Sequence, residues 1–117
     1  MDYEKEKRLA RSRAKVIKAL GHPTRIFMVA LLSEKDMSVG DLTEAVSADV
    51  STVSKHLSLL RQEGVLVDRK EGNRVLYSLI CPCIMKFIHC IDDIIYQDAE
   101  KGIICVKPGA KITGKKL

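Results

Sequence analysis

Residues 50–64, VSTVSKHLSLLRQEG, decide the fold of this chain. Apolar residues recur there at the spacing of one helix face: Val50, Val53, Leu57 and Leu60. The other faces carry small polar residues and a lysine, with no acid between Val50 and Arg61, and Gly64 is a natural helix end. The stretch therefore predicts a helix from about Val50 to Glu63 with one apolar side and one polar side that lacks acids.

A shorter helix is predicted immediately upstream. Ser38 and Asp41 form the pattern of an N-terminal cap, which predicts a helix over residues 39–47. Ala48 and Asp49 then interrupt the pattern before the next helix. Two short helices in this order, the second polar on its outer side, are typical of a helix-turn-helix.

The sequence downstream of Gly64 changes to alternation with a period of two. Strands are predicted over residues 66–70 and 74–79, because they flank the turn signal Glu71-Gly72-Asn73. A basic hairpin directly after such a helix is the wing of a winged helix. The fold class predicted is mainly α with a β-hairpin wing (α+β).

Two longer helices are predicted at the ends of this unit. Residues 3–20 have a narrow apolar stripe, and a broad apolar face follows Pro82, through to about Gly102. Pro23 begins a further helix that is apolar all round, as expected at the centre of a small core. We expect the last helix to pair across a homodimer, whereas the first packs against a partner subunit or, more plainly, onto its own domain. The domain predicted is 1–102, with 103–117 as a flexible basic tail.

Composition limits the classes of protein that remain. The 117 residues fit one domain, and no run reaches the ~18 uncharged apolar residues of a membrane helix. The N-terminus shows no export signal, so we expect a cytoplasmic protein with no membrane partner. The net charge of +5 comes entirely from five lysines in residues 101–117, so overall basicity is weak evidence for nucleic acid.

Several separated motifs resemble the ArsR/SmtB family of metalloregulatory repressors. They are Leu20-Gly-His-Pro-Thr-Arg25, Val53-Ser-Lys-His-Leu57, Leu60-Arg-Gln-Glu-Gly-Val-Leu66 and Arg69-Lys-Glu-Gly-Asn-Arg74 with Tyr77. The resemblance covers about residues 5–100. It implies a homodimeric, five-helix winged helix-turn-helix repressor whose first and last helices form the interface. It also implies release from double-stranded operator DNA when a metal ion, metalloid or other thiol-reactive inducer binds.

Candidate DNA contacts lie on the second helix of the helix-turn-helix and on the wing. On the helix they are Ser51, Thr52, Ser54, Lys55 and His56, since hydroxyl and amino groups near a helix start reach phosphates and base edges. His56 lies beside the apolar stripe, so a structural histidine is its alternative, and for the others the alternative is a solvated face. On the wing the candidates are Arg69, Lys70, Asn73 and Arg74, which we expect against the backbone or minor groove unless the tip is only solvated.

The familiar metal sites of the family have no counterpart here. The stretch that matches its Cys-Val-Cys motif is Met37-Ser38-Val39-Gly40-Asp41, which has no cysteine, and no histidine follows His89 to complete a zinc site with Asp92 and Asp93. Instead, Cys81 and Cys83 flank a proline. We expect Cys83 in the first turn of the last helix, where unpaired N–H groups and the helix dipole favour its thiolate.

Cys90 lies seven residues beyond Cys83, about 10 Å along a helix axis. Thiolates on one metal ion sit about 4 Å apart, so Cys90 joins the site only if a second subunit supplies its partners or if the helix starts later than Pro82. Its alternative is a small core residue. Cys105 is a candidate third ligand or a passive exposed thiol, and His89 a nitrogen ligand or a surface histidine.

The expected inducer is a thiophilic metal(loid), such as As(III) or Sb(III), bound by cysteines near the start of the last helix. A disulfide or persulfide switch at the same cysteines is the alternative, as is a regulator with no small-molecule sensor. No cofactor is required for the fold. No catalysis is expected, since the sequence has no Gly-rich phosphate loop, no nucleophile elbow and no thioredoxin-like Cys-x-x-Cys.

Overall fold

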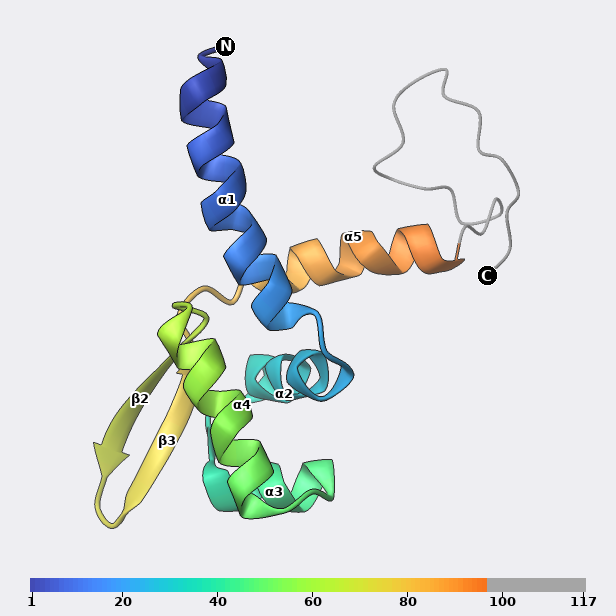
Figure 1. Ribbon diagram of the computed structural model, residues 1–117. Coiled ribbons are helices and arrows are strands. Elements are labelled where there is room, and N and C mark those ends of the chain that lie inside the picture. Colours follow the sequence, from blue (N-terminus) through green and yellow to red (C-terminus); the bar gives the residue numbers. More distant parts are fainter. Residues whose placement is uncertain (97–117) are drawn as a thin grey trace. The chain divides into compact units, whose positions relative to one another are not determined.

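The computed structural model describes residues 1–96, which form five helices and three strands (Figure 1). In chain order they are α1 (Tyr3–Leu20), α2 (Pro23–Glu34), β1 (Met37–Ser38), α3 (Val39–Val46), α4 (Val50–Gln62), β2 (Leu66–Glu71), β3 (Arg74–Leu79) and α5 (Ile84–Tyr96). The chain divides into two units, the first being Met1–Cys81 and the second beginning at Pro82. This order confirms the predicted winged helix-turn-helix.

The core of the first unit is built by α2, α3 and α4. Its fully buried side chains include Met28 and Val29 of α2, Leu42 of α3, and Val53, Leu57 and Leu60 of α4. The apolar stripe predicted for α4 is therefore confirmed from Val53 onward. Val50 is 57% exposed, because it occupies the first position of α4, ahead of the turn that packs inward.

Capping interactions fix where α3 and α4 begin. The Ser38 hydroxyl accepts a hydrogen bond from the Asp41 N–H, and the Asp41 carboxylate accepts one from the Ser38 N–H, which completes the predicted capping box. α3 ends at Val46, where Ser47 adopts a left-handed conformation (φ 59°). Asp49 then caps α4 after a connection of three residues.

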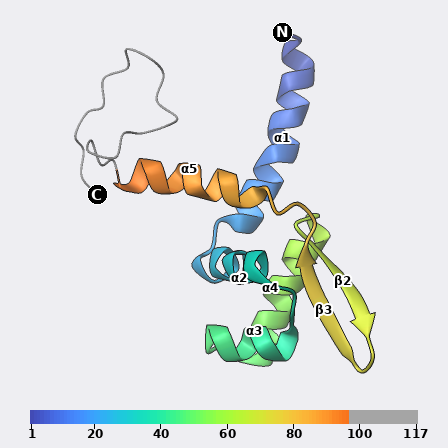
Figure 2. The ribbon, with the colours of Figure 1, turned by 180° about the vertical axis from the view of Figure 1, so that it is seen from behind.

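The hairpin forms as predicted, with a third strand added. β2 and β3 pair antiparallel from Leu66 opposite Leu79 to Glu71 opposite Arg74, and Gly72 supplies the positive φ of the turn. β1 pairs with β3 on the other side, giving the sheet order β1-β3-β2. The hairpin lies beside α4, which contacts β2, and both ribbon views show it extending away from the helices (Figures 1 and 2).

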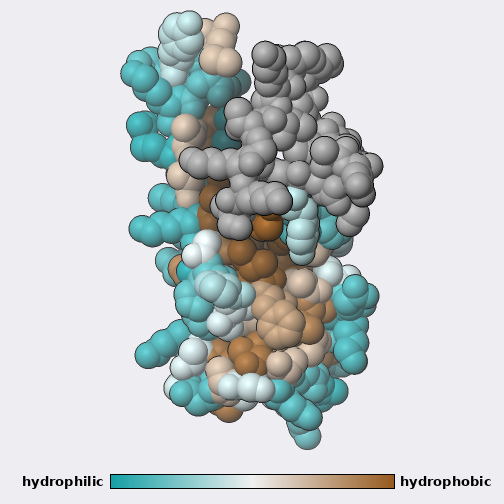
Figure 3. Space-filling model, turned by 90° about the vertical axis from the view of Figure 1, so that its right-hand side faces the viewer, coloured by the Kyte–Doolittle hydropathy of each residue, from teal (hydrophilic) through white to brown (hydrophobic). Residues whose placement is uncertain are grey.

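Much of α1 remains uncovered within the first unit. Only Ala19 and Leu20 of this helix are buried, and Ile17 of the predicted stripe is 53% exposed. α2 also exposes Phe27. Figure 3 shows hydrophobic residues at the surface below the grey atoms, bordered by hydrophilic ones. The apolar surface left on α1 agrees with a helix that packs against something else.

The second unit contains α5. This helix begins at Ile84, two residues later than the predicted start at Pro82, because Pro82 and Cys83 form a turn that precedes it. None of its residues is buried, and Phe87, Ile94 and Ile95 are exposed. The predicted helix end near Gly102 and the boundary at 102/103 lie outside the described residues.

No single helix within residues 1–96 has the length and apolar character needed to span a membrane. α1 and α2 meet those criteria only when counted together as a pair bent by 88°.

Candidate nucleic-acid interface

The first turn of α4 is fixed by Asp49. Its carboxylate accepts hydrogen bonds from the Thr52 N–H (2.7 Å) and from the Ser51 hydroxyl (2.9 Å). Hydrogen bonds from Thr52 and then Ser51 hold the pKa of Asp49 below its ordinary value, so the carboxylate stays ionised. Because the Ser51 hydroxyl donates its proton to Asp49, its oxygen remains available only as an acceptor for other groups.

The outer side of α4 is polar, as predicted. Ser51, Thr52 and Lys55 are exposed, and Ser54 is half-buried. Lys55 takes part in none of the ion pairs found among residues 1–96. This side therefore offers hydroxyl and ammonium groups within one turn, and a contact from any of them to DNA stays a prediction.

His56 faces the interior side of α4. Its ring lies against His22, the N-cap of α2, with the ring centroids 4.7 Å apart. The Arg25 guanidinium lies 3.1 Å from His56 Nδ1, and it can only donate, so Nδ1 accepts and Nε2 carries the proton. Burial first, then His22 and Arg25, lower the pKa of His56. This is the arrangement of a structural histidine, and a contact between His56 and DNA stays a prediction.

The two arginines of the wing are tied to the segment around β1. Arg74 donates to the Asp41 carboxylate (2.7 Å) and to the Ser38 hydroxyl (3.2 Å), which are the two side chains of the α3 capping box. Arg69 donates to Asp36 (2.6 Å), and this bond is the main cause of the lowered pKa of Asp36. Exposed ion pairs of this kind stabilise little, but they orient the hairpin relative to the helix-turn-helix.

The remaining wing candidates lie free of these pairs. Lys70 and Asn73 are exposed on β2 and in the turn. Arg69 and Arg74 are also exposed, so phosphates could reach them only by competing with Asp36 and Asp41. Sequence reasoning missed these ion pairs, because partners 33 residues apart leave no periodic signal.

The cysteine candidates lie at the junction of the two units and on α5. Cys81 and Cys83 are exposed and both are disulfide-bonded. Cys83 immediately precedes α5, and its carbonyl accepts from the Lys86 N–H, so the prediction that it lies within the first turn is wrong by one residue. Cys90 is half-buried on α5, and Cys105 lies outside the described residues. Within residues 1–96, no three His, Cys, Asp or Glu side chains gather as a metal site.

Comparison with known proteins identifies relatives of this arrangement. The family model for bacterial regulatory proteins of the arsR family matches residues 22–67. The HTH-type transcriptional regulator Rv0081 of Mycobacterium tuberculosis is 38% identical over 81 residues, which are 68% of this chain and 71% of that protein. The transcriptional repressor SdpR of Bacillus subtilis is 38% identical over 64 residues, 55% of this chain and 71% of SdpR.

Solved structures share the fold as well. The crystal structure of Rv0081 superposes with a TM-score of 0.70 at 33% identity, covering 80% of this chain and 94% of that one. The homodimeric winged helix-turn-helix DNA-binding domain of Mb0332 from Mycobacterium bovis gives a TM-score of 0.72 at 22% identity, covering 87% and 93%. The second likeness supports the fold alone.

Proposed function

This chain belongs to the arsR family of bacterial regulatory proteins, and we propose that it represses transcription by binding double-stranded operator DNA as a homodimer. The observation that carries this proposal is the exposed, acid-free side of α4 beside a basic hairpin. In a winged helix, these two elements enter the major groove and contact the backbone or minor groove. The family and its relatives are transcriptional regulators and repressors, which are not enzymes.

Within the groove, each candidate has a role that follows from its chemistry. Thr52 and Lys55 donate to phosphates, or Lys55 to a guanine edge, while Ser51 accepts from a base amino group. Ser54 contributes a hydroxyl from the half-buried edge of α4. Lys70 and Asn73 reach the backbone first, because Arg69 and Arg74 already have carboxylate partners.

The homodimer is proposed from apolar surface that the chain does not cover by itself. α5 buries none of its residues and exposes Phe87, Ile94 and Ile95, and α1 exposes Ile17. Surfaces of this kind on both terminal helices are typical of an interface between two copies. A dimer also presents two α4 helices, one to each of two successive major grooves of the operator.

Cys81 and Cys83 are proposed as the sensor. They flank Pro82, the residue at which the second unit begins, so a bond between their sulfurs constrains the link between the DNA-binding unit and α5. One thiolate attacks a low-molecular-weight disulfide, which breaks its S–S bond, forms a mixed disulfide and releases one thiol. The second thiolate then attacks the mixed disulfide, which forms the protein disulfide and releases the second thiol, so two electrons and two protons pass to the oxidant. This redox form of the proposal needs only these two sulfurs.

The metal(loid) form of the proposal uses the same two sulfurs in their reduced state. As(III) or Sb(III) prefers three thiolates, and the residues described within one chain do not bring three such ligands together. A third sulfur would come from Cys90 of a second copy or from Cys105. Either inducer would act by favouring a dimer geometry in which the two α4 helices no longer match the operator.

The test begins with duplexes selected from a random pool by the reduced protein. Fluorescence anisotropy then measures operator affinity with oxidised glutathione, with arsenite, or with neither. We expect one of the two inducers to weaken binding by about tenfold or more in the wild type and to leave Cys81→Ser/Cys83→Ser unaffected. Cys90→Ser is the matched control for the redox form. An equal response of the double variant and the wild type would overturn the sensor, and failure to select any duplex would overturn the repressor itself.

A further inference from the structure

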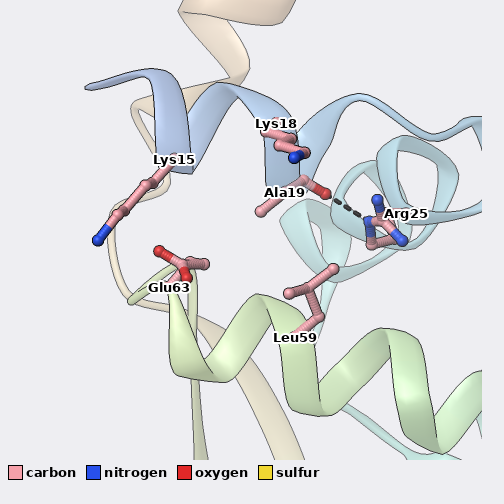
Figure 4. Close-up of a pocket in the computed structure, with 6 residues that line it drawn as sticks. All are labelled: Lys15, Lys18, Ala19, Arg25, Leu59 and Glu63. Carbon is pink, nitrogen blue, oxygen red and sulfur yellow. Dashed lines mark hydrogen bonds between the residues drawn. The ribbon is translucent and has the colours of Figure 1, made fainter. Parts of the chain in front are cut away.

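A cavity of about 290 Å³ lies where α1, α2 and α4 meet. α1 lines it with Lys15, Lys18 and Ala19, α2 with Arg25, and α4 with Leu59 and with Glu63, its C-cap. Figure 4 shows Arg25 at one end, Lys15 and Glu63 at the other, and Leu59 facing α1 between them. All of these residues belong to the first unit, and the cavity plays no part in the contacts proposed for DNA.

The charges around this cavity are unbalanced. Lys15, Lys18 and Arg25 supply three cations, and Glu63 is the single acid among the lining residues. None of these four side chains takes part in the ion pairs found within residues 1–96. The net positive charge suits an anionic group, whereas Ala19 and Leu59 suit an apolar one.

Arg25 is already held in position for such an anion. Its Nε donates to the Ala19 carbonyl (2.5 Å), and its Nη1 lies 3.1 Å from His56 Nδ1. Nη2 donates in neither bond and remains for a further acceptor. A guanidinium fixed by two neighbours loses little conformational freedom when it binds a carboxylate.

We propose that this cavity binds a small organic carboxylate, whose charged group contacts Arg25 and Lys18 and whose apolar part lies against Leu59 and Ala19. The volume is close to the ~300 Å³ lower end of small-molecule sites, so the ligand is small. The chemistry selects a carboxylate on an apolar body over inorganic phosphate, because phosphate leaves the apolar surface uncovered.

A ligand bound in this cavity affects α4. A carboxylate that accepts from both Nη atoms of Arg25 competes with His56 Nδ1 for Nη1, and Leu59 follows His56 on α4, with Glu63 as the C-cap of that helix. The ligand therefore changes the affinity of α4 for the operator, a consequence that rests on the proposed function. Binding to the cavity itself does not depend on DNA.

Benzoate is the probe for the direct test, with benzamide as its neutral counterpart. The full chain without DNA is titrated with each while amide chemical shifts are followed. We expect saturable shifts with benzoate in the amides of residues 18–25 and 56–63, and none with benzamide. Lys15→Ala/Lys18→Ala is expected to weaken benzoate binding by about tenfold, because the variant removes the Lys18 ammonium that contacts the carboxylate and the further positive charge of Lys15 at the other end of the cavity.

Lys5→Ala/Arg8→Ala is the matched control, since it removes the same charge from exposed or half-exposed positions of α1 about three turns away. It is expected to bind benzoate as the wild type does, and thermal unfolding confirms that both variants are folded. The proposal is overturned if benzoate gives no saturable shift, if both double variants bind benzoate equally weakly, or if inorganic phosphate binds and benzoate does not.

A second measurement separates this proposal from the proposed function. Benzoate is added to the protein on its selected duplex, and operator affinity is recorded. A changed affinity in the wild type that is absent in Lys15→Ala/Lys18→Ala supports the link from the cavity to α4. Benzoate binding with unchanged operator affinity overturns that link alone, and a protein that binds benzoate but no duplex overturns the repressor and leaves the cavity established.

Discussion

Lys55 stands one turn into α4 on its exposed side, and no carboxylate in residues 1–96 pairs with it. If it contacts a phosphate, it releases a counterion when DNA binds. We expect Lys55→Gln to weaken binding to specific and unrelated duplexes by the same factor. The slope of log affinity against log salt should fall in magnitude by about 0.9 for each phosphate that Lys55 no longer neutralises, or about 1.8 in a dimer.

The measurement is a salt titration of operator binding. Lys86→Gln serves as the control, because Lys86 is an exposed lysine of α5 outside the helix-turn-helix. If Lys55→Gln left the slope of log affinity against log salt unchanged, Lys55 would not contact a phosphate. It would then belong to a solvated face of the helix, which is the alternative given above.

His56 makes stability depend on pH, first because it is partly buried and then because His22 and Arg25 lie beside it. Its pKa lies below the ordinary 6.5 in the folded chain, chiefly because of burial, so folding favours the neutral ring. The stabilisation is complete above about pH 6.5 and is lost as the pH falls through the lower folded-state pKa. We therefore expect the free energy of unfolding to decrease between pH 7.5 and pH 5, above the range in which Asp36, Asp41 and Asp49 titrate.

Urea unfolding at both pH values measures this difference. His56→Gln keeps an acceptor for Arg25 and removes the titration, so its free energy of unfolding should change less with pH than that of the wild type. His89→Gln, which removes an exposed histidine of α5, should keep the wild-type dependence. A wild-type dependence that survives His56→Gln would assign the effect to another group.

At the scale of elements, the helices of the helix-turn-helix were predicted from the spacing of apolar residues and from the capping residues. The spacing of Val53, Leu57 and Leu60 and the Ser38/Asp41 pair are local patterns, and they placed α3 and α4 within one residue of their ends. β1 has two residues and owes its conformation to pairing with β3, so no alternation of apolar and polar residues in the sequence predicted it. The Arg74–Asp41 contact could not be predicted either, because it depends on the position of β3 in the folded chain and not on a local sequence pattern.

Gly64 ends α4 in a conformation that only glycine adopts without strain. Its φ is +79°, and a Cβ added there would meet nothing within 4 Å, so the cost of a side chain is conformational. We expect Gly64→Ala to lower the free energy of unfolding by about 1 kcal/mol. Gly40→Ala is the opposite control: Gly40 lies in α3 without a positive φ, and a Cβ would meet only Ser38 Oγ at 3.7 Å. It should stabilise by about 0.5 kcal/mol.

Chemical denaturation of both variants provides the check. The test is whether the two substitutions change the free energy of unfolding in opposite directions, because both add the same methyl group. A destabilising Gly40→Ala of equal size would show that the added methyl itself, and not the left-handed backbone, decides the outcome.

At the scale of the whole molecule, the sequence predicted which helices would lack a partner. The broad apolar face of the last helix and the narrow stripe of the first were visible as spacing, and α5 and α1 do leave apolar residues exposed. The cavity lined by Lys15, Lys18 and Arg25 was not visible, because its residues come from three helices and share no motif. The tertiary arrangement of α1, α2 and α4 creates it.

The homodimer itself is testable on α5, where Ile94 is 61% exposed. A carboxylate at the centre of an apolar interface would be desolvated without a partner, which costs several kcal/mol and acts in both copies. We expect Ile94→Glu to convert the protein from twice the 13.1 kDa chain mass to the chain mass in sedimentation equilibrium. Val67→Glu places the same charge on a half-exposed valine of β2 and should remain dimeric. Because a monomer presents a single α4, Ile94→Glu should also lose most of its operator affinity while keeping the helix content of the wild type. A dimer that persists in this variant would move the interface away from this part of α5.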